Sequence, residues 1–158
     1  MRYAPSLFDK LFQPPASDKR HELPGLSLEE LKDSVAADLE ALLNTRSPLD
    51  AATQIAFPYT ARSVMNYGVA DFSSRSLSSG LDRDFICQAI QHTIETQERR
   101  LRSVAVSIDD GQRGFNRLSF TIRATLLVSD VGEQVSFDAR FEPTVQRYSV
   151  SNQRLARR

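Results

Sequence analysis

Two segments of the chain carry apolar residues at intervals of three and four, the spacing that places them on one face of an α-helix. At the start of the first segment, Ser27 and Glu30 have the spacing of a capping box, and Leu26 and Leu31 have that of a hydrophobic staple. We expect this helix to end near residues 44–46. Its apolar stripe, which another element must cover, consists of Leu28, Leu31, Val35, Leu39 and Leu42.

The second helical pattern runs from Asp82 or Asp84 to about Gln97, with acidic residues near the positive end of the helix dipole. One face of this predicted helix carries Phe85, Ile86, Ala89, Ile90 and Ile94. Beyond it the apolar period changes to two, which indicates β-strands at residues 101–108, 118–128 and 135–141. Because turn-forming residues separate these three runs, consecutive antiparallel hairpins are expected.

These elements predict an α+β fold in which two main helices pack on a small antiparallel three-stranded meander sheet, with a short N-terminal helix. Residues 1–26 are predicted to form that helix and a linker, residues 27–145 the main domain, and residues 146–158 a basic tail. Three strands would leave two sheet edges with unpaired main-chain groups.

Three segments that lack a strong helix or strand pattern each allow two interpretations. The N-terminal apolar cluster either packs on its own domain or anchors in a groove of a partner. The tail is either a solvated terminus or a basic arm that docks on an acidic partner. The long irregular segment at residues 46–80 indicates function or mobility. The cluster comprises Leu7, Phe8, Leu11 and Phe12, and the tail carries Arg147, Arg154, Arg157 and Arg158.

The composition excludes several classes of function. Among the 158 residues, 20 basic and 20 acidic side chains cancel, so the chain as a whole does not attract nucleic acid or anionic lipid. Cys87 is the single cysteine and His21 and His92 are the two histidines, so no disulfide within the chain and no zinc site are expected. We find no signal peptide and no run of roughly 20 apolar residues, which predicts a cytosolic protein without a membrane span.

Candidate catalytic residues are few. Glu98 could be an acid in glycoside hydrolysis, but the arginines beside it favour its ionised form, which is wrong for an acid at neutral pH. Asp109 and Asp110 lie in a predicted turn, where aspartate is common for backbone reasons. Cys87 and His92 are about 140° apart around an ideal helix, so they do not form a catalytic pair. The sequence therefore predicts no enzyme and no cofactor.

The stretch QERRL at residues 97–101 stands where the second helix changes to a strand. Glu98 and Arg100 there could form a structural ion pair that fixes the turn. The same residues could instead face a partner, where guanidinium groups make bidentate contacts. Both interpretations remain open at the level of the sequence.

Several stretches together resemble the TssE family of type VI secretion baseplate components, part of the wider lysozyme-like baseplate wedge family of contractile-tail phages. The resemblance covers about residues 6–141. The family pattern Glu-Pro-Arg corresponds to Glu98, Arg99 and Arg100, with arginine in place of proline at the middle position, which restores a backbone N–H there. The matching stretches are residues 6–11, 31–46, 64–72, 98–101 and 135–138.

This resemblance implies a non-enzymatic baseplate wedge lysozyme-like domain at residues 27–145. Its implied role is to join the wedge proteins TssF, TssG and TssK to the sheath proteins TssB and TssC, at the cytoplasmic side of the inner membrane. There it would help to initiate sheath polymerisation, with a sheet edge that accepts strands of the sheath. The alternative function is a peptidoglycan-cleaving lysozyme-like enzyme. The expected partner-binding residues are Glu98, Arg99, Arg100, Leu7, Phe8 and Leu11.

Overall fold

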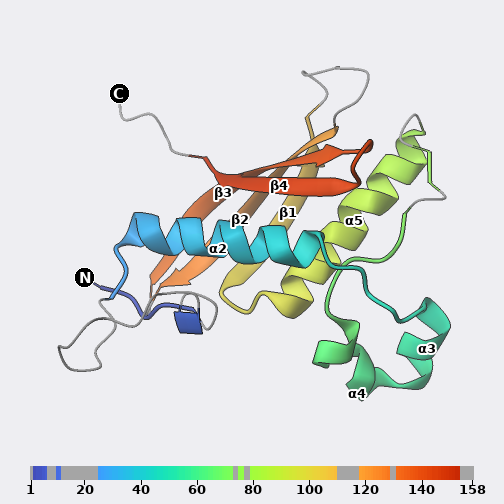
Figure 1. Ribbon diagram of the computed structural model, residues 1–158, viewed down its shortest axis with the longest axis horizontal. Helices are drawn as coiled ribbons and strands as arrows, with labels where there is room; N and C mark the ends of the chain where they lie inside the picture. Colours follow the sequence, from blue (N-terminus) through green and yellow to red (C-terminus); the bar gives the residue numbers. More distant parts are fainter. Residues whose placement is uncertain are drawn as a thin grey trace.

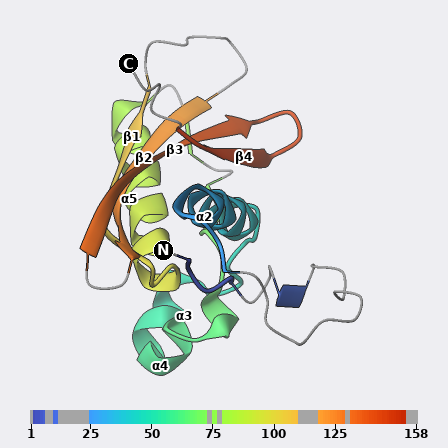
Figure 2. The same cartoon turned by 90° about the vertical axis from the view of Figure 1, so that its left-hand side faces the viewer.

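The computed structural model describes residues 2–6, 10–11, 25–72, 75–76, 79–109, 118–128 and 131–153. Its centre is a four-stranded antiparallel sheet in the order β1-β2-β3-β4, with each strand beside its sequence neighbour. Helices α2 (Leu28–Leu43) and α5 (Gly80–Gln97) pack on one face of this sheet, which curves around them (Figures 1 and 2). The strands are β1 (Leu101–Ile108), β2 (Leu118–Val128), β3 (Val131–Glu142) and β4 (Arg147–Asn152).

The predicted three-stranded meander with two main helices is wrong, because the sheet has a fourth strand and further short helices lie between α2 and α5. Strand β4 lies in the segment predicted to be a tail, and its register pairs Phe141 with Tyr148 and Ala139 with Val150. Tyr148 and Val150 are the only apolar residues of β4, which is too few for a recognisable alternation. The short helices are α3 (Ala51–Ala56), α4 (Pro58–Ala61) and the 3₁₀-helix η1 (Val64–Asn66).

Helix α2 begins as the sequence predicts. The Ser27 hydroxyl accepts the N–H of Glu30, and the Glu30 carboxylate accepts the N–H of Ser27, so the capping box is confirmed. The helix ends at Leu43 with Asn44 as its C-cap, within the predicted range. The N-terminal helix predicted from the cluster at residues 7–12 falls largely outside the described residues.

The core lies between the sheet and the two helices. Alternate residues of β2 and β3 point at the helices, as their period of two predicts, and meet the apolar stripes of α2 and α5. Complete burial of a leucine, isoleucine or phenylalanine side chain contributes about 1.5–3 kcal/mol each. The largest fully buried side chains are Phe120, Phe137, Leu39, Ile90, Ile94, Leu101, Ile122, Leu126 and Val35.

Strand β1 contains an extra residue. Its register against β2 shifts between Arg102 and Ala105, and Ser103 has a φ of 50°. A non-glycine residue at positive φ is uncommon and typically marks a bulge or a turn. Since β1 is an edge strand, the bulge interrupts the regular row of main-chain groups that an unbroken edge would present.

The short helices form a projection beyond the helix-sheet body (Figures 1 and 2). Its base is held to the end of α2 by two main-chain hydrogen bonds, from the Val69 N–H to the Thr45 carbonyl at 2.8 Å and from the Ser47 N–H to the Val69 carbonyl at 3.0 Å. Gly68, at a φ of +113°, permits this approach, because a Cβ there would lie 2.5 Å from the Thr45 carbonyl oxygen.

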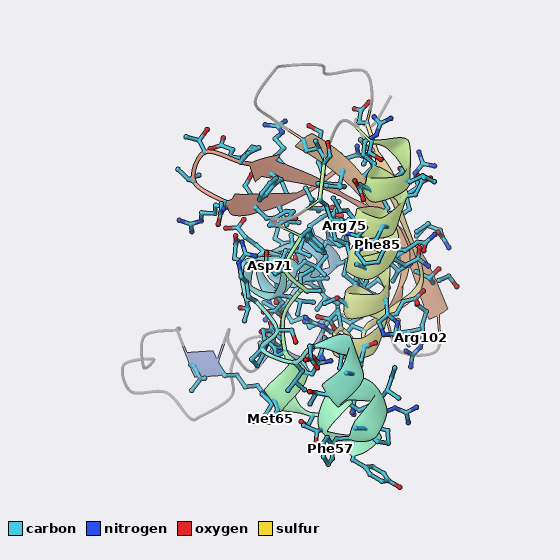
Figure 3. The ribbon with its side chains drawn as sticks, turned by 90° about the vertical axis from the view of Figure 1, so that its right-hand side faces the viewer. Phe57, Met65, Asp71, Arg75, Phe85 and Arg102 are labelled. Carbon is cyan, nitrogen blue, oxygen red and sulfur yellow. The ribbon has the colours of Figure 1, made fainter. Side chains whose placement is uncertain are left out.

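The connection from the projection to α5 is also fixed by side chains. The Arg75 guanidinium lies 4.1 Å from the ring centroid of Phe85, a cation–π geometry, and Arg75 Nη1 is 3.0 Å from Asp82 Oδ1 (Figure 3). The hydrogen bond from Arg75 lowers the pKa of Asp82, with further help from the Ser76 N–H. These contacts tie the loop to the first turn of α5.

Candidate interaction site

Glu98, at the end of α5, and Arg100, just before β1, form the ion pair that the sequence suggested. Arg100 Nε is 2.9 Å from Glu98 Oε1, and Arg100 Nη2 is 2.5 Å from Glu98 Oε2, so the contact is bidentate. Glu98 Oε1 also accepts the N–H of Arg100 at 3.0 Å. The backbone N–H of the same arginine thus helps to fix the helix-to-strand turn.

Asp38 of α2 is the third member of this network, and the sequence analysis missed it. Its Oδ2 lies 2.5 Å from Arg100 Nη2, so one guanidinium joins α2, the end of α5 and the start of β1. The side chains are 12% (Glu98), 17% (Asp38) and 28% (Arg100) exposed, which limits the access of water. The available signal was an acidic residue at the border of the apolar stripe of α2.

The electrostatics of the network favour the charged form of Arg100. Burial alone would lower the pKa of Arg100, but its hydrogen bonds and charge interactions with Glu98 and Asp38 outweigh burial and raise that pKa above its ordinary value. Burial raises the pKa of the nearby Tyr67 hydroxyl, and the charges of Asp38 and Glu98 add to the rise. An arginine that holds both oxygens of the Glu98 carboxylate is suited to positioning the turn between α5 and β1.

The other predicted partner-binding residues are not brought into this network. Arg99 is exposed beside it, and Leu11 is also exposed. Leu7 and Phe8 lie outside the described residues. Cys87 is partly buried, and burial raises the pKa of its thiol, which is the opposite of what a thiolate nucleophile needs.

The outer edge of β4 is closed by side chains of α2. Asn44 Oδ1 accepts the N–H of Tyr148 at 2.8 Å, and Asn44 Nδ2 donates to the Tyr148 carbonyl at 2.9 Å. Glu40 Oε2 accepts the N–H of Val150, also at 2.9 Å. Because Asn44 mimics a paired strand residue and Glu40 takes the next outward amide, α2 and its C-cap occupy this edge at Tyr148 and Val150.

The outer edge of β1 is different. The Asp109 N–H donates to the Ser119 carbonyl, and the antiparallel alternation therefore directs the main-chain groups of Val106 and Ile108 away from β2. The Ile108 amide hydrogen-bonds the Cys87 thiol of α5, and the Leu101 N–H donates to the Glu98 carbonyl. Within the described residues, the Val106 N–H has no hydrogen-bond partner, so the middle of this edge is open.

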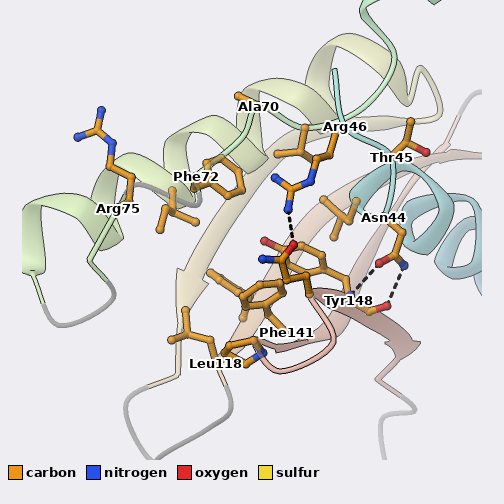
Figure 4. Close-up of a pocket in the computed structure, with 15 residues that line it drawn as sticks. Asn44, Thr45, Arg46, Ala70, Phe72, Arg75, Leu118, Phe141 and Tyr148 are labelled. Carbon is orange, nitrogen blue, oxygen red and sulfur yellow. Dashed lines mark hydrogen bonds between the residues drawn. The ribbon is translucent and has the colours of Figure 1, made fainter. Parts of the chain in front are cut away.

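A cavity of about 210 Å³ lies between the end of α2, residues 69–72 with Arg75, and the turn between β3 and β4 (Figure 4). Phe72, Leu118 and Phe141 supply much of its apolar lining. Arg46, which lines the cavity, forms an ion pair with Asp71, and its Nη2 donates to Gln146 Oε1 at 3.1 Å. Burial raises the pKa of Tyr148, which also lines the cavity, to about 12.

No group of three or more histidine, cysteine, aspartate or glutamate side chains in the described part of the chain is arranged to hold a metal ion. None of its helices is both long and apolar enough to cross a lipid bilayer.

The family model described as "Baseplate wedge protein gp25" matches residues 29–131, which include all of α2 except Leu28, the projection, α5, β1 and β2. A search of curated proteins finds no match to this chain. The matched range contains the whole Asp38, Glu98 and Arg100 network.

Proposed function

This chain belongs to the baseplate wedge protein gp25 family, which is a family of baseplate structural proteins, and from that premise we propose that it joins the wedge of a type VI secretion baseplate to the contractile sheath. In this role it is a non-enzymatic subunit on a baseplate at the cytoplasmic side of the inner membrane. Its partners are the wedge proteins TssF, TssG and TssK and the sheath proteins TssB and TssC, and it helps to initiate sheath polymerisation.

The observation that carries this proposal is the difference between the two sheet edges. Strand addition gains affinity from main-chain hydrogen bonds, so it needs an edge with groups that are not already paired. Helix α2 supplies partners to β4 through Asn44 and Glu40, whereas the Val106 amide of β1 keeps none among the described residues. An incoming sheath strand is therefore expected at β1.

The QERRL stretch has a positioning role in this proposal. Arg100, held by Glu98 and Asp38, fixes the first residue of β1 relative to both main helices. Arg99 is exposed in the adjoining turn, where it can contact a partner directly. The bulge at Ser103 follows, so the strand register open to a partner begins beyond it.

A matched pair of substitutions tests the proposal with purified TssB and TssC. Ser107→Lys adds a charge to the open edge strand, and Ser149→Lys adds the same charge to the closed one; both serines are exposed. An edge lysine opposes strand addition. We expect Ser107→Lys to weaken capture of the sheath proteins by about tenfold or more and Ser149→Lys to leave it near wild type.

Val106→Pro is a second test, because proline removes the outward amide without removing a hydrogen bond to β2. Circular dichroism first establishes that each variant is folded. Equal sheath capture by wild type, Ser107→Lys and Val106→Pro would exclude the β1 edge. Release of muropeptides from cell-wall sacculi by the purified protein would instead support the enzymatic alternative.

A further inference from the structure

The projection formed by α3, α4 and η1 exposes an unusual concentration of large apolar side chains. Each of the five is between 60% and 91% exposed, and they fall within eleven consecutive residues. A cluster of this kind is typical of an interaction surface, whereas single exposed apolar residues are common and need no explanation. The five are Ile55, Phe57, Tyr59, Val64 and Met65.

Local hydrogen bonds hold this apolar projection in one conformation. The Asp50 carboxylate caps α3 by accepting the Thr53 N–H at 2.7 Å. Asn66 Nδ2 donates to the Ala61 carbonyl at 2.9 Å, and Gln97 Nε2 donates to the Asn66 carbonyl at 3.3 Å. The exposed side chains are therefore presented on a preorganised frame, which lowers the entropic cost of binding.

Apart from the Asp50 carboxylate that caps α3, the charge of the projection is positive. Arg62 is the only charged residue between positions 51 and 70. The bond from Gln97 to Asn66 brings the end of α5 against η1, and the exposed Arg99 follows two residues later. Arg102 is also on the face that displays Phe57 and Met65 (Figure 3). No ion pair joins these three arginines to an acidic residue within the described part of the chain.

We propose that the apolar projection inserts into an apolar groove with an acidic rim on another baseplate subunit. The projection stands out from the body (Figure 1), so it suits a concave partner better than it would suit a helix laid across it. The arginines at its base select acidic side chains at the rim of that groove. A second copy of this chain is disfavoured, because a symmetric contact through the projection would bring two copies of the same positively charged surface together.

The inference rests on the proposed function for the class of partner, and its experiment uses purified TssF and TssG. The double variant Ile55→Ser/Tyr59→Ser removes two of the exposed apolar groups. Leu81→Ser is the matched control, because Leu81 is 84% exposed at the start of α5, outside the projection. We expect the double variant to bind these wedge proteins at least about tenfold more weakly, with Leu81→Ser near wild type.

Charge is tested separately with Arg62→Glu. This variant should lose affinity for the wedge proteins, and the wild-type affinity should fall as salt is raised, since rim contacts are screened. If wild type and Arg62→Glu bind the wedge proteins with equal affinity at low salt, the proposal of an acidic rim is overturned. The sheath proteins provide an internal control, because none of these substitutions touches β1.

The outcomes distinguish the two proposals. If the wild type binds TssF and TssG and the double variant binds them equally well, this inference is overturned and the proposed function stands. Failure of the wild type to bind both wedge and sheath proteins overturns both. A dimer in sedimentation that the double variant dissociates would identify a second copy as the occupant and would also overturn the inference.

Discussion

The two edges of the sheet differ in which neighbour completes them. At β4, Asn44 and Glu40 of α2 accept the outward N–H groups of Tyr148 and Val150, so the helix acts as a substitute strand. At β1, α5 and its C-cap reach the edge only at the two ends of the strand, through Cys87 at the Ile108 amide and through the Glu98 carbonyl at the Leu101 N–H. The comparison teaches that one sheet can carry a protected edge and an accessible edge although both edge strands are antiparallel to their neighbours.

The difference depends on a few polar side chains rather than on the apolar core. Both edges lie beside a helix with a continuous apolar stripe, and both helices pack on the same face of the sheet. What separates them is that α2 places an amide and a carboxylate level with the outward groups of β4. Substitutions of those side chains, and of the ion network at the start of β1, should therefore change the difference between the two edges while the core stays intact.

The largest effect is expected from Arg100→Ala at the start of β1. It leaves the Glu98 and Asp38 carboxylates close together and largely shielded from water without their shared cation. Removing one partner of a fully buried pair costs about 3–5 kcal/mol, and partial exposure here reduces the expected loss to about 2–3 kcal/mol. Urea unfolding measures the loss, and Arg99→Ala, at an exposed neighbour, should stay within about 0.5 kcal/mol of wild type.

Asn44→Ala should open the protected edge. The substitution removes both hydrogen bonds to the Tyr148 main chain and the bond from Asn44 Nδ2 to the Glu40 carbonyl. Because water can reach this exposed position, we expect a loss of about 1–2 kcal/mol in the free energy of unfolding. An unchanged urea midpoint would mean that Asn44 does not hold the edge closed.

Tyr148 should make the stability of the β4 side depend on alkaline pH. Its pKa is raised to about 12 from 10.0, so its contribution is complete below pH 10 and is lost as the pH rises from 10 through 12. The loss at pH 11 is about 1.4 kcal/mol. Unfolding of the wild type and Tyr148→Phe at pH 9 and pH 11 isolates this contribution, since the variant lacks the titrating group. An identical pH dependence in both proteins would contradict the assignment.

The smallest effect is expected from Glu40→Gln. The amide oxygen can still accept the Val150 N–H, but the hydrogen bond loses its charge, which should cost less than about 1 kcal/mol. Hydrogen exchange is the sensitive measurement: the Val150 amide should exchange faster in the variant, with the Val106 amide unchanged. In the wild type, Val106 should exchange faster than Val150 if the two edges differ as described.

The parts of the fold that the sequence predicted are those with strong local signals. The capping box at Ser27, the end of α2 near Asn44 and the buried alternation of β2 are all confirmed. Strand β4 could not be predicted in the same way, because RYSVSN offers two apolar positions and its edge is completed by Asn44 and Glu40, more than a hundred residues earlier in the chain.

The candidate site likewise has a part that local sequence predicted and a part that depends on distant residues. Glu98 and Arg100 are two residues apart, so their pairing could be proposed from the sequence. Asp38 lies 62 residues from Arg100, and nothing in the local pattern indicates that one guanidinium contacts both carboxylates. The apolar projection was visible only as an irregular segment, because α3 and α4 are too short to establish a helical period.

The close approach of the chain at Gly68 to the end of α2 has a mechanical consequence. A force applied to the apolar projection is carried first by the hydrogen bonds between Thr45, Ser47 and Val69, then by the end of α2, and finally by Asn44 into β4. These links act in series along this path, and the hydrogen bond from Gln97 Nε2 to the Asn66 carbonyl gives a second path from the projection to α5. The close approach that Gly68 permits keeps the first link short and stiff, and a pull by a bound neighbour would move the protected edge of the sheet together with the projection.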